Sequence, residues 1–184
     1  MSSRFNLRYA AQICLSGGVI AYPTESVYGL GCDPLDETAV QRILYLKQRE
    51  VEKGVILISD DIQKLIPFIV ISSQQQTQIL QQQDKPTTWL VPASELTPFW
   101  IRGSHEKVAV RITRHRVARE LCAELPWPIV STSANPAGLL PARNAIRVQQ
   151  YFKYQLDGIV AGAVNKHGSP SVIRDLESNQ IIRA

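Results

Sequence analysis

The sequence predicts a single-domain α/β fold, built on a twisted mixed β-sheet with flanking helices. Helix-like and strand-like segments alternate along the chain, and in several places two strand-like segments follow one another directly. No linker or change in composition divides the chain. Because 184 residues with 45% hydrophobic content can bury a sizeable core, we expect one domain over residues 7–184.

The first helix is expected from apolar residues that recur at helical spacing. Asn6 is its expected N-cap, and Gly17 and Gly18 are expected to end it. A buried strand over residues 19–22 follows, and Pro23 breaks it. The apolar residues at helical spacing are Leu7, Ala10, Ala11, Cys14 and Leu15.

A second helix is expected from Asp36, its N-cap, to the region of residues 47–49. A short apolar strand at 55–58 follows it, and residues 60–61 are expected to open another helix. Residues 74–83 hold seven glutamines, which we interpret as a solvated helix or a loose loop rather than an aggregation-prone tract.

In the second half, one helix is expected over residues 117–125, with His115 near its start and Pro126 and Pro128 after its end. Another helix is expected over residues 143–152. The remaining apolar runs predict strands at 88–91, 107–113, 129–130, 159–161, 171–174 and 180–183.

The composition argues against several classes of protein. No apolar run approaches the roughly 18 residues of a membrane helix, and the first residues lack a signal-peptide core. We therefore expect a cytoplasmic protein with no membrane partner. The cysteines are odd in number and show no CxxC spacing, so buried free thiols are favoured over a metal site. They are Cys14, Cys32 and Cys122.

Three separated polar segments stand where a buried strand or an amphipathic helix should end. They are residues 22–31, 47–49 and 131–135. In α/β sheets, ligand groups gather at the carboxyl ends of strands and at nearby helix termini. The hydroxyls, amide, lysine and arginine gathered here predict a site for a phosphate-bearing ligand. The sequence offers no general acid–base pair, which suits catalysis by positioning and charge neutralisation.

A more ordinary explanation exists for each of these groups. Lys47 and Arg49 could stabilise the negative end of their helix from an exposed position. The hydroxyls of residues 131–133 could form a turn that satisfies its own backbone. Arg111, which ends an apolar alternation, could be a solvated strand residue. The residues by themselves leave these alternatives open.

Five motifs in a fixed order give a resemblance to a known family. The chain carries Pro-Thr-Glu and Tyr-Gly-Leu-Gly within 23–31, Lys-x-Arg at 47–49, Val-Ala-Val-Arg at 108–111, Ser-Ala-Asn at 133–135 and Ser-Val-Ile-Arg-Asp at 171–175. It thereby resembles the YrdC-like family in its short, single-domain bacterial form, over nearly the whole chain.

The resemblance implies a YrdC-like fold and a nucleotidyltransferase activity. Such an enzyme would form L-threonylcarbamoyladenylate and pyrophosphate from L-threonine, bicarbonate and ATP, with Mg²⁺ accompanying the ATP. The product would serve the N6-threonylcarbamoyladenosine modification of tRNA next to the anticodon. Separate threonylcarbamoyl-transferase machinery would carry out that transfer.

The resemblance also assigns roles to individual positions, and it assigns none to a metal. The catalytic positions are Lys47, Arg49, Ser133 and Asn135. The ATP-binding positions are Lys47, Arg49, Lys53, Ser133, Asn135, Pro141 and Arg174. The threonine-binding positions are Thr24, Ser26, Arg111, Ser131 and Ser171.

This chain departs from the family pattern at two places. Glu50 stands where a proline is common, and Lys85 replaces the glycine of a Gly-Pro-x-Thr element that here ends in Thr88. The loop after Arg49 is therefore expected to be shaped differently from that of the family, and the Gly-Pro-x-Thr element is only partly present.

Two other interpretations remain open. Residues 102–119 hold six basic side chains against Glu106 alone, within a chain of net charge +4, which could make an RNA-binding face. Such a face could belong to an RNA-binding module or could recruit tRNA weakly to an enzyme. A YrdC-like paralogue with another substrate would share the same motifs.

Overall fold

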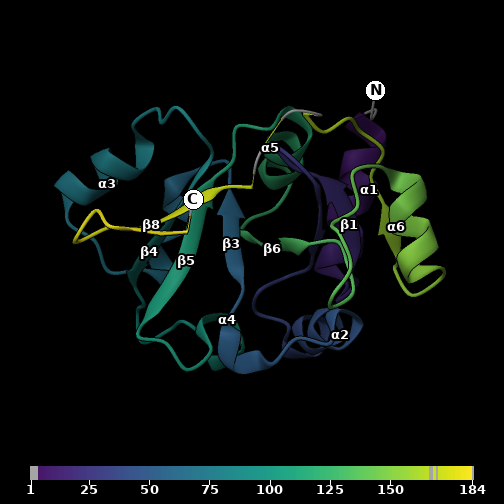
Figure 1. The fold of residues 1–184 in the computed structure, drawn as a ribbon, viewed down its shortest axis with the longest axis horizontal. Coiled ribbons are helices and arrows are strands. Elements are labelled where there is room, and N and C mark those ends of the chain that lie inside the picture. Colours follow the sequence, from purple (N-terminus) through teal and green to yellow (C-terminus); the bar gives the residue numbers. More distant parts are fainter. Residues whose placement is uncertain (1–3, 166–167, 169, 184) are drawn as a thin grey trace.

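The computed structural model describes residues 4–165, 168 and 170–183, which form one nine-stranded sheet with helices packed around it (Figure 1). The strands are β1 (Ile20–Pro23), β2 (Tyr28–Gly31), β3 (Ile56–Ser59), β4 (Thr87–Pro92), β5 (Lys107–Ile112), β6 (Ile129–Ser133), β7 (Gly158–Ile159), β8 (Val172–Asp175) and β9 (Ile181–Arg183). The helices are α1 (Arg4–Leu15), α2 (Glu37–Lys47), α3 (Ser73–Leu80), α4 (Phe99–Arg102), α5 (Arg116–Ala123) and α6 (Ala145–Phe152).

The sheet is mixed, and its spatial order differs from its order in the chain. The strands lie in the order β7-β1-β2-β6-β3-β5-β4-β8-β9. β1 with β7, β3 with β5, and β4 with β8 pair in parallel, and the other neighbours pair antiparallel. A single mixed sheet with flanking helices confirms the predicted fold class. β6 lies between β2 and β3, although it follows both by many residues.

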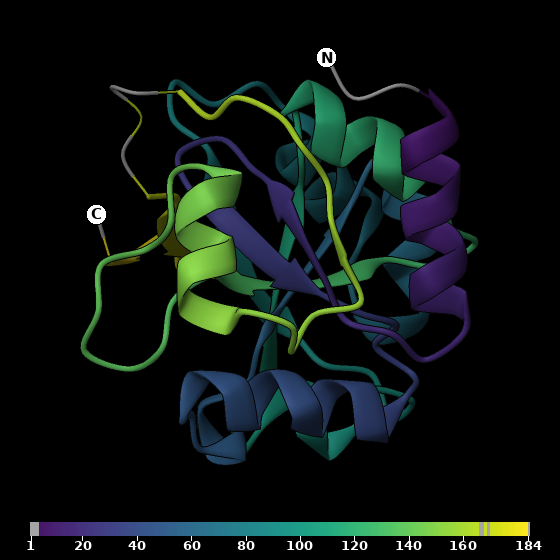
Figure 2. The same ribbon diagram turned by 90° about the vertical axis from the view of Figure 1, so that its right-hand side faces the viewer.

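Two hydrophobic clusters cover opposite faces of the sheet, because successive side chains of a strand point to opposite sides. Ile20 and Tyr22 pack in a cluster with α1 and α5, whereas Val19 and Ala21 belong to a second cluster with α2, α4 and α6. Figures 1 and 2 show α1 beside α5, with α2 and α6 apart from this pair. The polar segments of interest lie at strand and helix ends between these apolar layers.

The end of α2 is built to place its last residues. Asp36 caps the helix by accepting a 3.0 Å hydrogen bond from the backbone N–H of Ala39, as predicted. Gln48 then adopts a left-handed conformation with φ 51°, and the Arg49 N–H returns to the Leu44 carbonyl at 2.9 Å. This turn ends the helix at Lys47 and redirects the chain.

Some helix boundaries differ from the sequence-based expectation. Asn6 lies inside α1, because the helix already includes Arg4. Residues 60–61 precede only a 3-10 turn, Ile62–Lys64, with Asp61 as its cap. The glutamine-rich segment forms α3, a solvent-exposed helix, and this confirms the solvated interpretation.

The three cysteines are buried and free, as predicted. Burial raises the pKa of the Cys14 thiol to about 12 and raises that of Cys32 as well, so both stay protonated near neutral pH. Among the described residues, every helix is too short or too polar to cross a membrane.

Candidate active site

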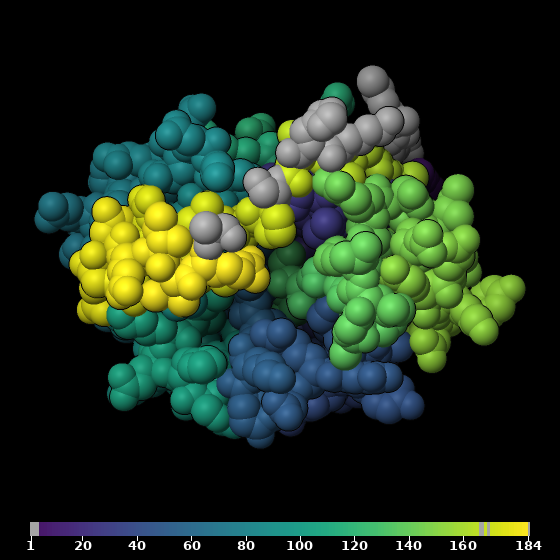
Figure 3. Space-filling model, viewed as in Figure 1, coloured from purple at the N-terminus to yellow at the C-terminus, as the bar shows by residue number. Residues whose placement is uncertain are grey.

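One face of the molecule has a hollow at its centre. Figure 3 shows this hollow between the C-terminal segment in yellow, the segment after β6 in green and the region at the end of α2 in blue. Three groups of polar side chains, described in turn below, come from these surroundings.

The first group joins the end of α2 to the end of β6. Lys47 Nζ donates hydrogen bonds to the backbone carbonyls of Ser133 and Asn135, the latter at 3.0 Å, and lies 3.4 Å from Ser133 Oγ. Ser133 Oγ in turn donates to Asn135 Oδ1 at 2.6 Å. The structure thus brings together three of the four residues predicted to be catalytic.

Lys47 is buried, with 7% of its surface exposed, so the expectation of an exposed helix end is wrong for this residue. Burial, with a smaller contribution from the charge of Arg49, lowers the pKa of Lys47 to about 8. Its partners among the described residues are carbonyl and hydroxyl oxygens, with no carboxylate. A buried cation without an anionic partner is suited to bind an anionic ligand.

Arg49, the fourth residue, is held by the loop that follows it. Its guanidinium donates to the carbonyl of Lys53 at 3.1 Å and to that of Gly54 at 2.9 and 3.1 Å. Gly54 has φ 58°, and a Cβ there would lie 2.9 Å from the Ile101 carbonyl, so glycine is required. The exposed Lys53 side chain pairs with Glu50 at 2.9 Å and is not bonded to the Lys47 group.

The loop after β6 partly bears out the ordinary explanation for the Ser-Ala-Asn segment. Asn135 Nδ2 donates to the carbonyls of Pro136 and Leu139 at 3.0 and 2.8 Å. The amide therefore braces its own loop and also lies beside Lys47. Pro141 is half-buried in the same loop, next to Ala142, whose backbone bonds to Ala134 and Tyr28.

The second group is formed by the β1–β2 loop and the neighbouring strands. Thr24 Oγ1 donates to the Val27 carbonyl at 2.7 Å, which is an ordinary turn contact. Ser26 is buried in the same loop, and Ser131 is buried on β6. A Cβ at Gly29 would lie 3.4 Å from Ser131 Oγ, so glycine there leaves room around this hydroxyl.

Arg111 joins this loop through Glu25, a residue to which the sequence analysis gave no role. Arg111 is buried, so the solvated alternative is wrong, and its Nη2 lies 3.4 Å from Glu25 Oε2. Thr113 Oγ1 donates to Glu25 Oε1 at 2.9 Å. Glu25 is the last residue of the Pro-Thr-Glu motif. The motif marks this residue, but the sequence does not show that its side chain contacts β5.

The third group is placed by the parallel pairing of β4 with β8. Thr88 Oγ1 donates to Ser171 Oγ at 2.9 Å, and both residues are buried. Trp89 pairs with Arg174, whose guanidinium carbon lies 5.9 Å from the centre of the indole ring. The Arg174 Nε is buried without a hydrogen-bond partner among the described residues.

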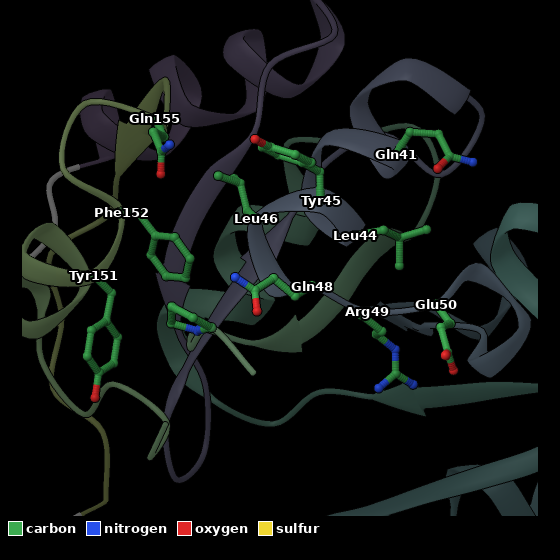
Figure 4. A pocket seen from close by; sticks show the side chains of 11 residues that line it. Gln41, Leu44, Tyr45, Leu46, Gln48, Arg49, Glu50, Tyr151, Phe152 and Gln155 are labelled. Carbon is green, nitrogen blue, oxygen red and sulfur yellow. The ribbon is translucent and has the colours of Figure 1, made fainter. Parts of the chain in front are cut away.

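A groove of about 680 Å³ lies between α2 and α6, beside the predicted site (Figure 4). Of the predicted site residues it includes Arg49 alone, so the buried polar groups, and not this groove, define the site. The groove is lined by Gln41, Leu44, Tyr45, Leu46, Gln48, Arg49, Glu50, Pro136, Tyr151, Phe152 and Gln155.

A smaller cavity of about 160 Å³ adjoins the second group. It opens beside Glu25, Trp89 and Arg114, under the segment that joins α3 to β4. Lys85, which replaces the glycine of the family pattern, lines this cavity, so the departure in sequence falls close to the site.

The basic stretch 102–119 does not present a common face of free cations. Lys107 pairs with Asp175 and Glu177, and the guanidinium of Arg114 donates to the Leu80 carbonyl. These partners reduce the support for an RNA-binding module. Basic side chains of the stretch with protein partners are Arg102, Lys107, Arg111, Arg114 and Arg116.

Comparison with known proteins places the chain in a family. A model of the Sua5, YciO and YrdC proteins, described as telomere recombination, matches residues 12–184. The chain belongs to the Sua5/YciO/YrdC family. Two curated members are named threonylcarbamoyl-AMP synthase. The one from Pseudomonas syringae pv. syringae (strain B728a) is 50% identical over 190 residues and 100% of both chains. The one from Cellvibrio japonicus (strain Ueda107) is 51% identical over 178 residues, or 96% of this chain and 94% of that one.

Solved structures of the family share this fold. Sua5 of P. abyssi, complexed with L-threonine, superposes with a TM-score of 0.87 and 31% identity over 94% of this chain. The match covers 51% of that Sua5, so this chain spans about half of its length. YciO of E. coli gives a TM-score of 0.83 at 22% identity, over 98% of this chain and 89% of that one, and shows the same fold.

Proposed function

We propose that this chain is a threonylcarbamoyl-AMP synthase, a nucleotidyltransferase that makes L-threonylcarbamoyladenylate and pyrophosphate from L-threonine, bicarbonate and ATP. Curated family members with this name match essentially the entire chain. A solved family member holds L-threonine. The residues of the site supply the chemistry that this reaction requires, as argued below.

The observation that carries the proposal is the buried ammonium of Lys47, which lies between the end of α2 and the end of β6, two segments distant in the chain. It is fixed by carbonyls of the β6 end, and the described residues offer it no carboxylate. Arg49 lies two residues farther, half-buried and bound only through carbonyl oxygens. A point charge and a planar guanidinium at one helix end match the oxygens of a polyphosphate.

ATP would lie against the first and third groups. Lys47 and Arg49 would bind its phosphates, with Ser133 and Asn135 as uncharged polar groups beside them. Arg174, Pro141 and the exposed Lys53 would contact other parts of the nucleotide; we infer these three from the family motifs.

Threonine would lie against the second group, next to Ser171. The buried guanidinium of Arg111 would receive its carboxylate, because an arginine pairs with a carboxylate through directed N–H bonds. The hydroxyls of Thr24, Ser26, Ser131 and Ser171 are small uncharged groups that suit a polar zwitterion of this size.

In the reaction, the neutral threonine amine forms a bond to the carbon of carbon dioxide that bicarbonate supplies. The amine proton and the hydroxide lost by bicarbonate leave as water, and a carbamate remains. A carbamate oxygen then forms a bond to the α-phosphorus of ATP. The bond from that phosphorus to the α–β bridging oxygen breaks, and pyrophosphate leaves with the electron pair. The residues act by holding the two reactants in line and by neutralising phosphate charge, as is usual for transfer at phosphorus.

We propose that Mg²⁺ is bound by the phosphates of ATP and arrives as part of that substrate. Among the described residues, no group of three or more His, Cys, Asp or Glu side chains is arranged to hold a metal ion. The roles given above to the residues involve no bond between protein and metal.

The product would be an activated intermediate for the threonylcarbamoyl modification of adenosine next to the tRNA anticodon. We expect separate transferase machinery to use it, and we expect the enzyme to work in the cytoplasm. Any direct contact with tRNA would be weak, since most cations of the stretch 102–119 already have protein partners. A salt titration of tRNA binding tests this last point.

The decisive experiment incubates the protein with ATP, Mg²⁺, bicarbonate and each amino acid in turn. We expect pyrophosphate and a threonylcarbamoyl adenylate to form with L-threonine, and to depend on bicarbonate. Equal product with another amino acid would instead identify a paralogue, and no product with any of them would sink the proposed function.

A further inference from the structure

We infer that Glu25 is a positioning residue of the threonine site, which fixes the guanidinium of Arg111 and ties the β1–β2 loop to β5. The inference rests on the proposed function, since it concerns how the threonine site is built. It assigns a role to the motif residue Glu25, which had none.

The contacts of Glu25 span two elements that are far apart in the chain. Its Oε2 lies 3.4 Å from Arg111 Nη2, and its Oε1 accepts hydrogen bonds from Thr113 Oγ1 at 2.9 Å and from the Arg114 backbone N–H at 3.4 Å. One carboxylate therefore contacts Arg111 within β5 and Thr113 and Arg114 just after that strand. Glu25 lies in the β1–β2 loop between Thr24 and Ser26, so its contacts with residues of β5 and just after it also hold that loop in place. Thr24 and Ser26 belong to the proposed threonine site.

The carboxylate remains charged in this buried position. Burial by itself raises the pKa of Glu25, but the positive charge of Arg111 and the hydrogen bonds to the carboxylate outweigh it, so the pKa is lowered. The Glu25 and Arg111 side chains are 16% and 9% exposed, and solvent therefore screens the pair weakly. A buried pair of this kind is sensitive to removal of either charge.

Two atoms of the pair are left without hydrogen bonds, and they point to a ligand. Arg111 Nε and Glu25 Oε2 are buried with no hydrogen-bond partner among the described residues. Buried polar atoms are normally satisfied, and leaving them unpaired costs free energy. The Arg111 guanidinium is held through Nη2, and its Nε–H makes no hydrogen bond within the described part of the chain. Such a guanidinium can donate hydrogen bonds to the carboxylate of a ligand.

The test replaces Glu25 with glutamine, which keeps its shape and removes its charge. We expect Glu25→Gln to raise the KM for threonine roughly ten- to a hundred-fold and to leave the KM for ATP within about threefold. The matched control is Glu124→Gln, which removes a carboxylate that pairs with Arg4 and Arg8 away from the site. It should leave both KM values unchanged. A threonine KM within about twofold of the parent for Glu25→Gln would overturn the inference.

A double-mutant cycle tests whether Glu25 acts through Arg111. In an Arg111→Lys background, Glu25→Gln should raise the threonine KM much less than it does in the parent, because the group that it positions has been replaced. Additive losses would show that Glu25 acts independently of Arg111.

If Glu25→Gln does not fold, Thr113→Val provides the second variant. It removes the hydroxyl that donates to Glu25 Oε1 and that also accepts from the His115 backbone N–H at 3.3 Å, and it leaves the charges. It should raise the threonine KM about threefold or more, and an unchanged value would contradict the inference. Calorimetric threonine binding separates the two proposals. If the unsubstituted protein binds threonine but does not turn it over, the proposed function is refuted, and the Kd for threonine of the Glu25 variant still tests the inference. If the unsubstituted protein does not bind threonine, both the proposed function and the inference are overturned.

Discussion

Thr88 donates a hydrogen bond of 2.9 Å from its Oγ1 to Ser171 Oγ, across the pairing of β4 with β8. Both side chains are buried, so a residue of the sheet interior orients a hydroxyl assigned to the threonine site. Ser171 lies immediately before β8, and the register of that strand with β4 places it. The geometry of the site therefore depends on strand register as much as on the motif residues.

Thr88→Val should weaken the use of threonine. Valine keeps the shape of threonine and removes the hydroxyl that orients Ser171, which costs about 0.5–1.5 kcal/mol, or roughly a two- to ten-fold drop in kcat/KM for threonine. The matched control is Thr87→Val, whose hydroxyl bonds to the Lys85 carbonyl instead. Steady-state kinetics with threonine as the varied substrate measure both, and equal effects would remove Thr88 from the site.

Arg49→Ala should impair the use of ATP and should cost some stability, because it leaves the carbonyls of Lys53 and Gly54 without this donor. Loss of a charge-assisted phosphate contact costs about 1.5–3 kcal/mol, or roughly ten- to a hundred-fold in kcat/KM for ATP. Lys47→Ala should have the same kinetic effect and should also destabilise the protein, because it leaves the carbonyls of Ser133 and Asn135 without this donor. Activity is therefore compared per folded molecule. Full activity in both variants would favour the simple helix-end explanation.

ATP binding should weaken as the pH rises through about 8, where Lys47 loses its proton in the free protein. Binding measured without threonine isolates this effect from titration of the substrate amine. Lys47→Arg, which stays charged, should show no such fall, and a flat parent profile between pH 7 and 9.5 would argue against the assignment.

The pKa of Lys47 is lower in the folded protein than in the unfolded chain. Lys47 by itself should therefore make the free energy of unfolding rise with pH between about 8 and 10.5.

Asn135→Ala should reduce adenylate formation more than it reduces stability. The amide lies beside Lys47, but it also braces its loop through the Pro136 and Leu139 carbonyls, so some loss of stability, about 1 kcal/mol, is expected. Melting temperature and kcat measured on one preparation separate the two roles. A large loss of stability with unchanged kcat per folded molecule would make Asn135 a turn residue only.

Threonine should be strongly preferred over valine. A site that hydrogen-bonds the substrate hydroxyl leaves its own polar groups unpaired when valine binds, and such sites discriminate far better than apolar pockets do. Competition between the two amino acids, followed by analysis of the adenylates, measures the ratio of their kcat/KM values. Comparable turnover of valine would contradict the assignment of Ser26, Ser131 and Ser171.

The sequence predicted the parts of this molecule that depend on local pattern. The periodic apolar residues of α1 and α2, the cap at Asp36 and the predicted strands appear as expected. Residues 28–31, which were expected to belong to a polar segment beyond a strand, instead form the buried strand β2. The burial of Lys47 was not predictable, because it results from the packing of α2 against the distant end of β6. For the same reason, a motif showed Glu25 but could not show its contact with Arg111.

Helix ends were predicted less well than helix interiors. Asn6 has the chemistry of an N-cap, but α1 already includes Arg4, so the capping preference of one residue did not fix the helix boundary. The site residues Ser133 and Asn135 were placed correctly beside Lys47 by the family motifs. The residues alone left both a turn and a ligand site open, and the structure shows features of both.

The position of β6 in the sheet has a consequence for how the protein forms during synthesis. β6 pairs with β2 on one side and β3 on the other, yet it is made after about two thirds of the chain. Until residues 129–133 emerge, the facing edges of β2 and β3 have no partner, and Lys47 lacks the carbonyls that hold it. Long-range pairing of this kind is slow and leaves strand edges open to wrong association. The nascent chain therefore brings together Lys47, Ser133 and Asn135, the residues proposed to bind the nucleotide, late in synthesis and together with the closure of its sheet.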